Sequence, residues 1–228
     1  MLKRTRINPL FPHHPQNRTF FSFPTPFSSP PPPTPTKGSL VHKDGISIYQ
    51  ESRSLPYTPR ELYSIIADVD SYASFLPFAT SSSVLSATRI RSTGQRESTN
   101  ISGKEWLSLK EGVEGEKWEM QAELRAGAMG FEEGYVSKVE AEKFKFVSAR
   151  ASNSTLFKHL HSSWTLTPLS VPPTAANRNR PNTKVDLYLA YAFSSPLHAV
   201  VVSSAWEKVS GMMIDGFEKR LGTIYGKR

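Results

Sequence analysis

Residues 183–194 have the sequence TKVDLYLAYAFS, in which large apolar side chains recur at every second position. These positions are Val185, Leu187, Leu189, Tyr191 and Phe193. Since successive side chains of a β-strand point to opposite faces, all of them would lie on one face. The segment therefore predicts a strand that buries one face against a core.

Residues 195–225 change from the strand period to the helix period. Ser195 is a favoured N-cap residue, and Pro196 suits the first helical position. Apolar or small residues then recur at three- and four-residue steps, at Val202, Ala205, Trp206, Val209, Met213, Gly216, Phe217, Leu221 and Ile224. We predict one helix from Leu197 to Tyr225, roughly 40 Å long and able to cross a whole sheet.

Shorter alternating segments precede this strand and helix. They cover residues 46–51, 82–90, 117–125, 131–139, 143–149 and 156–167. The turns between them are short, which favours an antiparallel meander over alternating strands and helices. We interpret residues 46–51 as an edge strand. Two polar segments without a period, residues 88–116 and 170–182, predict surface loops.

Two helices are predicted after the first strand. Residues 58–61, TPRE, form a capping box with proline at the first helical position, and the apolar residues that follow have helical spacing. This helix should end near Asp68. Asp70 and Ser71 can cap a second, very short helix over residues 72–75.

The positive charge is concentrated at the N-terminus. The 228-residue chain has a formal net charge of +8, and six of its cationic residues lie within residues 1–43, which contain no acidic residue. Subtracting these six leaves +2 on the remainder, so we expect no nucleic-acid surface on the folded part. There is no cysteine, which excludes disulfides, thiol catalysis and cysteine-ligated metals.

The N-terminal segment has the composition of a targeting sequence. Residues 1–36 are rich in Arg, Ser, Phe and Pro and free of acid, which is typical of a mitochondrial transit peptide, an unprocessed disordered arm being the alternative. We therefore predict a targeting segment and Pro-rich disordered linker over residues 1–43 and one folded domain over 44–228. No stretch has the roughly 20 apolar residues needed to span a bilayer, so membrane contact would be peripheral.

Three groups of motifs bracket almost the whole predicted domain. The first comprises Tyr49, Ser52-Arg53, PYTP (56–59), Leu62-Tyr63, ADVDSY (67–72) and FLP (75–77); the second Phe157-Lys158, Leu160 and Ser163-Trp164; the third FSSPLH (193–198), Phe217-Glu218, Arg220 and Tyr225-Gly226. Together they resemble the coenzyme Q-binding protein family of the START-like superfamily. Phe78 and Trp206 depart from the family pattern, which has Trp and a pair of Phe there, and the loop at 88–116 is longer than usual.

The resemblance implies an α+β, START-like helix-grip fold: a curved antiparallel sheet wrapped around a long C-terminal helix, with two short helices after the first strand. It implies a non-enzymatic protein that binds ubiquinone and delivers it for respiratory electron transport and quinone synthesis. It further implies peripheral contact with the matrix face of the mitochondrial inner membrane, and contacts with respiratory or quinone-synthesis complexes.

Such a carrier needs a dry cavity, because each buried CH2 group of an isoprenoid tail is worth about 0.8 kcal/mol. The predicted lining is Trp164, Leu187, Leu189, Tyr191, Phe193, Trp206, Val209, Met212, Met213, Phe217 and Arg220. The predicted cavity mouth or membrane contact is Phe75, Leu76, Pro77 and Phe78. A filled core and a packed turn are the respective alternatives. Arg220 falls inside the apolar stripe and should pair with an acid, reach water or meet a polar head group, with pairing preferred.

Signals for catalysis are weak. His159 and His161 would lie on the face opposite Trp164 without a third ligand, so no metal site is expected. Asp68 resembles a helix cap and His198 a capping or core residue. Two other functions stay open on this fold: a polyketide cyclase-like enzyme that uses His198 or Asp68, and a ribosome-associated module.

Overall fold

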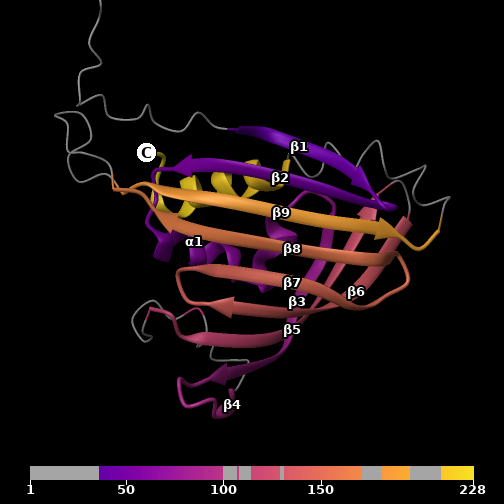
Figure 1. Cartoon of the computed structure of the whole chain (residues 1–228), viewed down its shortest axis with the longest axis horizontal. Coiled ribbons are helices and arrows are strands. Elements are labelled where there is room, and N and C mark those ends of the chain that lie inside the picture. The colour runs from indigo at the N-terminus through magenta and orange to yellow at the C-terminus, as the bar shows by residue number, and fades with distance from the viewer. Residues whose placement is uncertain (1–35, 100–106, 108–113, 129–130, 171–180, 196–211) are drawn as a thin grey trace, which may run out of the picture. The chain divides into compact units, whose positions relative to one another are not determined.

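The computed structural model describes residues 36–99, 107, 114–128, 131–170, 181–195 and 212–228. Within this part, nine antiparallel strands form one sheet in the order β1-β2-β9-β8-β7-β6-β5-β3-β4 (Figure 1). The strands are β1 (Thr36–Lys43), β2 (Ile46–Leu55), β3 (Ala79–Ile90), β4 (Arg96–Thr99), β5 (Lys117–Ala128), β6 (Phe131–Glu142), β7 (Phe146–Ser154), β8 (Phe157–Pro168) and β9 (Thr183–Phe193). The predicted antiparallel meander is confirmed.

Two short helices lie between β2 and β3, as predicted: α1 (Pro59–Ile66) and the 3-10 helix η1 (Val69–Ser74). η1 begins earlier than predicted, with Asp68 at the N-cap position, so Asp70 and Ser71 lie inside it and do not cap it. The capping box of α1 is complete. The Glu61 amide donates to the Thr58 hydroxyl at 3.1 Å, and the Thr58 amide donates to the Glu61 carboxylate at 2.8 Å. The apolar side of α1 is buried against the inner face of the sheet.

The chain ends in a helix that is described over residues 212–225. Ile214, Phe217 and Leu221 form its buried stripe, while Ile224 is 47% exposed. Ile214, which was not among the predicted stripe residues, is therefore part of the buried stripe. Ile224, which was predicted to be part of it, lies in the last turn of the helix and is exposed. The predicted N-cap at Ser195–Pro196 and the helix over 197–211 lie mostly outside the described residues.

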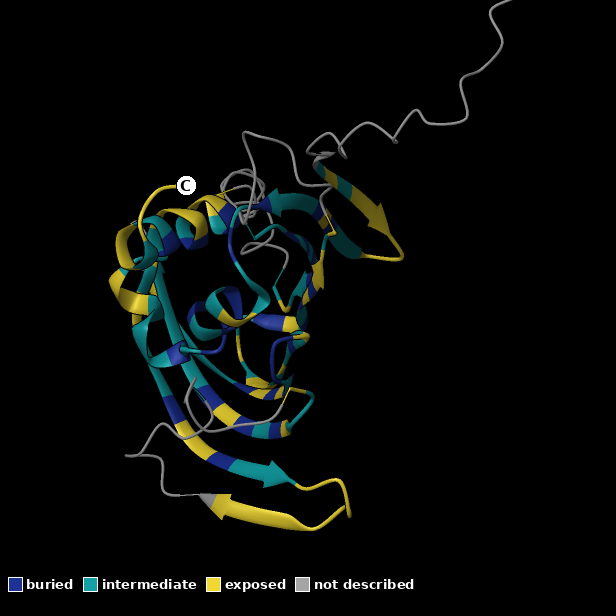
Figure 2. Cartoon of the chain, turned by 90° about the vertical axis from the view of Figure 1, so that its left-hand side faces the viewer, coloured by how far each residue is buried: buried dark blue, intermediate teal, exposed yellow. Residues whose placement is uncertain are grey.

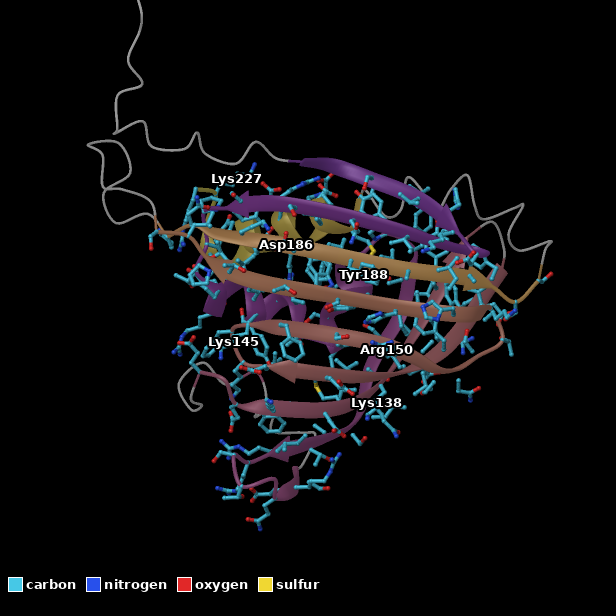
Figure 3. The ribbon with its side chains drawn as sticks, in the orientation of Figure 1. Lys138, Lys145, Arg150, Asp186, Tyr188 and Lys227 are labelled. Carbon is cyan, nitrogen blue, oxygen red and sulfur yellow. The ribbon has the colours of Figure 1, made fainter. Side chains whose placement is uncertain are left out.

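The inner and outer faces of the sheet differ in chemistry. Val185, Leu187, Leu189 and Tyr191 of β9 are buried, as are Leu160, Trp164 and Leu166 of β8, which confirms the predicted alternation. Figure 3 shows Lys138, Arg150, Asp186 and Tyr188 on the outer face, opposite α1 and the C-terminal helix. Side chains that face the helices are therefore mainly apolar, and those that face away are mainly polar.

The beginning of the domain differs from the prediction. Residues 36–43, predicted as the end of a disordered linker, form β1 and pair with β2. Asp44 and Gly45 make the connecting turn with positive φ angles of 52° and 75°, the conformation that a two-residue hairpin favours. As a result β2 has a neighbouring strand on each side, β1 and β9. The prediction of an edge strand at 46–51 was therefore wrong.

The predicted loop at 88–116 is partly strand. β3 begins at Ala79 and runs to Ile90, and β4 pairs with it along an exposed edge (Figure 2). Register shifts at Ala79/Ser81 and Val84/Ser86 break the alternation of β3, which is why its start was placed too late. The rest of this segment, apart from Leu107 and 114–116, and most of the second predicted loop lie outside the described residues.

Candidate cavity between the sheet and the helices

A cavity of about 140 Å³ lies between the inner face of the sheet and the elements that cover it. Its floor is formed by Ala122, Leu124, Ala126, Tyr135, Ser137, Val139, Val147, Ala149, Leu160, Ser162, Trp164 and Leu189. Its roof is formed by Val69, Tyr72, Leu76, Pro77, Phe78, Ala79, Met213 and Phe217. The strands β5 to β9 therefore supply the floor, and η1, the segment after it and the C-terminal helix supply most of the roof.

Small side chains in the middle of the floor leave this space empty. Ala122, Ser137, Ala149 and Ser162 point inward from four consecutive strands, β5 to β8. Protein interiors are close-packed and seldom contain voids much larger than a water molecule. A cavity of this volume is consequently a specific feature of the inner face and not an ordinary packing defect.

Aromatic rings join the roof to the floor. The ring centroid of Phe217 lies 4.7 Å from that of Trp164, 5.4 Å from that of Tyr72 and 5.2 Å from that of Phe75. The Tyr72 hydroxyl donates to the Ile66 carbonyl, and burial, followed by the charge of Asp68, raises its pKa above the usual range. Tyr72 therefore stays neutral and adds no charge to the part of the cavity lining next to Phe217.

Leu76, Pro77 and Phe78 form the mouth of the cavity. Phe78 is 43% exposed and has a φ of +67°, which is unusual for an aromatic residue. Gly216 of the C-terminal helix lies against this segment, because a Cβ added there would be 3.4 Å from Cδ2 of Leu76. An outer groove of about 420 Å³, lined by Phe75 and Met212 among others, adjoins the mouth.

Arg53 attaches the C-terminal helix to β2. Its guanidinium lies 2.5 Å from the carboxylates of both Glu51 and Asp215, and 3.3 Å from that of Glu218. Burial lowers the pKa of Arg53, but hydrogen bonds to Asp215 and Glu51 raise it more, so its pKa lies above the usual range. Burial and a hydrogen bond to Glu51 likewise raise the pKa of Tyr49. This ion cluster fixes the position of the helix that roofs the cavity.

Seven of the predicted site residues line the cavity: Trp164, Leu189, Met213, Phe217, Leu76, Pro77 and Phe78. Others lie outside the lining. Leu187 and Tyr191 share the inner face of β9 but pack into the core, and Phe193 stacks on Phe157 with centroids 5.3 Å apart. Phe75 and Met212 line the outer groove. Trp206 and Val209 lie outside the described residues.

Arg220 has an unexpected environment. No ion pair of Arg220 with an acid is found among the described residues, so the preferred prediction of a pairing stays a prediction. Its guanidinium carbon lies 5.6 Å from the centre of the Phe75 ring, a cation–π arrangement, and its buried Nε has no hydrogen-bond partner. Because Phe75 also packs on Phe217, Arg220 stabilises the roof from outside the cavity.

The candidates for catalysis and metal binding lie elsewhere. Asp68 is the N-cap residue of η1, but its side chain accepts a hydrogen bond from the Ser71 hydroxyl and not from a backbone amide of the helix. It is not part of the cavity lining. His198 lies outside the described residues. His161 lies on the outer face, where its ring is 3.1 Å from the Ser148 hydroxyl. No three potential metal ligands gather among the described residues.

Sequence reasoning missed most of the floor. The missed residues are Ala122, Leu124, Ala126, Tyr135, Ser137, Val139, Val147, Ala149, Leu160 and Ser162, together with Val69, Tyr72 and Ala79 of the roof. A signal was present: small residues occupy inward positions of four successive strands. The prediction instead took the largest residues of the most apolar strand and helix.

A family model described as "Polyketide cyclase / dehydrase and lipid transport" matches residues 55–218. The chain belongs to this family. Its curated relatives include two named as mitochondrial coenzyme Q-binding proteins. The Xenopus laevis COQ10 homolog B is 28% identical over 221 residues, covering 96% of this chain and 70% of that protein. The Dictyostelium discoideum COQ10 is 28% identical over 175 residues, covering 77% of this chain and 69% of that protein. The predicted resemblance is confirmed.

Solved structures of other proteins share the fold. The Zhui aromatase/cyclase from Streptomyces sp. R1128 superposes with a TM-score of 0.52 at 10% identity, covering 77% of this chain and 93% of that one. An 18 kDa protein from Caulobacter crescentus superposes with a TM-score of 0.51 at 22% identity, covering 79% of this chain and 99% of that one. A START superfamily protein from Mycobacterium smegmatis superposes with a TM-score of 0.51 at 13% sequence identity, covering 78% of this chain and 98% of that one. The predicted START-like helix-grip fold is confirmed.

Proposed function

We propose that this protein binds coenzyme Q and carries it without transforming it. The observation that carries the proposal is the cavity itself, whose walls are mainly apolar and whose floor is kept open by small side chains. The names of the two relatives, coenzyme Q-binding proteins, support this choice of ligand. Shape and a few polar groups, rather than total buried area, would then determine affinity.

The volume of the cavity limits which part of the ligand is enclosed. An engineered protein cavity of about 150 Å³ binds one benzene molecule, so about 140 Å³ has room for one six-membered ring and not for a long isoprenoid tail. We propose that the quinone ring enters the cavity and the tail leaves through the mouth at Leu76, Pro77 and Phe78.

The tail must avoid water once it leaves the mouth, because each exposed CH2 group costs about 0.8 kcal/mol. Phe78 at the mouth and Met212 in the adjoining groove are large, exposed apolar side chains. No described helix is long and apolar enough to cross a bilayer. We propose peripheral contact through this region with the matrix face of the mitochondrial inner membrane, where the protein delivers ubiquinone for respiration and quinone synthesis.

The proposal is tested by extracting the full chain with organic solvent after expression in a host that makes ubiquinone. The wild-type protein should release quinone, and Ala149→Leu, which fills the middle of the floor, should release much less. Ala192→Leu is the matched control, since Ala192 lies on the outer face of β9. Wild-type protein free of quinone, or Ala149→Leu carrying as much as wild type, would refute the proposal.

A further inference from the structure

Two serine side chains in the floor of the cavity are not used by the fold. Ser137 and Ser162 both line the cavity, and neither hydroxyl makes a hydrogen bond within the described residues. Ser137 is buried. A hydroxyl group in apolar surroundings is unfavourable unless it is hydrogen-bonded, and most buried polar groups in proteins have a partner. Such groups are suited to a ligand that brings acceptor oxygens.

The strand register fixes how far apart the two serines are. Ser137 is on β6 and Ser162 on β8, with β7 between them. Ala149 of β7 pairs with Ser162 of β8 on one side and with Val139 of β6 on the other. Ser137 is two residues before Val139, so it is displaced from Ser162 by two strands and, along the strand, by one inward-facing position. With about 4.8 Å between strands and about 6.7 Å between alternate residues, their Cα atoms are about 12 Å apart.

This inference rests on the proposed function. We infer that Ser137 and Ser162 bind the two oxygens at opposite positions of a 1,4-quinone ring that lies over Ala149. Two hydrogen bonds of about 2.8 Å each, with an oxygenated six-membered ring between them, can bridge a span of that order. Alanine leaves the space above β7 free for the ring, while the serines on β6 and β8 flank it.

Tyr135 supplies a third hydroxyl on the side of the mouth. It precedes Ser137 on the inner face of β6 and pairs with Leu124 of β5, close to where Ala126 pairs with Ala79. Its hydroxyl also has no hydrogen-bond partner among the described residues, and burial raises its pKa, so it stays protonated and can donate. It would meet a ring substituent on the way to the mouth.

The test measures the affinity of the full chain for a short-tailed 1,4-benzoquinone and for an alkylbenzene with the same tail but no oxygen. Quenching of tryptophan fluorescence reports the quinone, since Trp164 lines the cavity, and calorimetry reports both ligands. Ser137→Ala and Ser162→Ala should each weaken quinone binding about threefold to tenfold and leave alkylbenzene binding unchanged. Ser163→Ala, the neighbouring residue on the outer face of β8, should change neither.

Thermal unfolding of each variant shows whether the fold is intact, and removing an unsatisfied hydroxyl should not lower the midpoint. If the wild type binds the quinone and the double variant with both Ser137→Ala and Ser162→Ala binds it equally well, the inference is overturned while the proposed function stands. If the wild type binds neither ligand, the proposed function fails and the inference with it.

Discussion

Replacing Ala149 with leucine should stabilise the protein while it abolishes ligand binding. Leucine adds three carbon atoms in the middle of a cavity of about 140 Å³. Burying them is worth about 2.4 kcal/mol at about 0.8 kcal/mol each, and ordering the side chain costs about 0.5–1 kcal/mol. The expected gain is about 1.5 kcal/mol in the free energy of unfolding, or about 3–6 °C in melting temperature for a chain of this size.

The assay is urea or thermal unfolding of ligand-free protein, followed by quinone titration of the same samples. Ala141→Leu is the matched control, because Ala141 also faces inward and is buried but lies outside the cavity lining. Overpacking at that close-packed position should destabilise by about 1–3 kcal/mol. If Ala149→Leu destabilises as much as Ala141→Leu, the space above β7 is already filled and the reasoning fails.

Three further predictions concern the frame around the cavity. Arg53→Gln should weaken attachment of the C-terminal helix and speed amide hydrogen exchange over residues 212–225, whereas Arg150→Gln on the outer face should leave it unchanged. Burial raises the pKa of Glu116, but Lys143, 2.7 Å away, and Arg89 lower it more, so its stabilisation is present above the ordinary pKa of 4.5 and lost as pH falls further. Unfolding titrations should therefore show a shallower loss of stability on acidification for Glu116→Gln; an unchanged slope would contradict this. Gly216→Val should displace Leu76 at the mouth and slow quinone entry in stopped-flow fluorescence more than Gly222→Val does.

Local signals predicted much of the fold. The capping box at 58–61, the alternation of β8 and β9 and the helical period near the C-terminus are each encoded within a few residues. The hairpin between β1 and β2 was missed although its signal was present, since Asp44-Gly45 is a favoured two-residue turn between strands. The linker was predicted to continue to residue 43, although the Pro-rich composition ends before β1 begins at Thr36.

The cavity was harder to predict because it depends on which strands are neighbours and in what register. Ser137, Ala149 and Ser162 are far apart in sequence, and only the order β6-β7-β8 brings them together. Periodicity separates inward from outward positions but does not distinguish a packed face from a hollow one. Arg220 illustrates the same limit, since its contact with the ring of Phe75 depends on how the C-terminal helix packs and has no local signal in the sequence.

A crystal structure of the full chain with a short-tailed 1,4-benzoquinone would be the most direct measurement. We expect the ring over Ala149, its two oxygens near Ser137 and Ser162, and its tail directed past Phe78. A ring bound in the outer groove beside Phe75 and Met212, with only water over Ala149, would contradict enclosure of the quinone between sheet and helices.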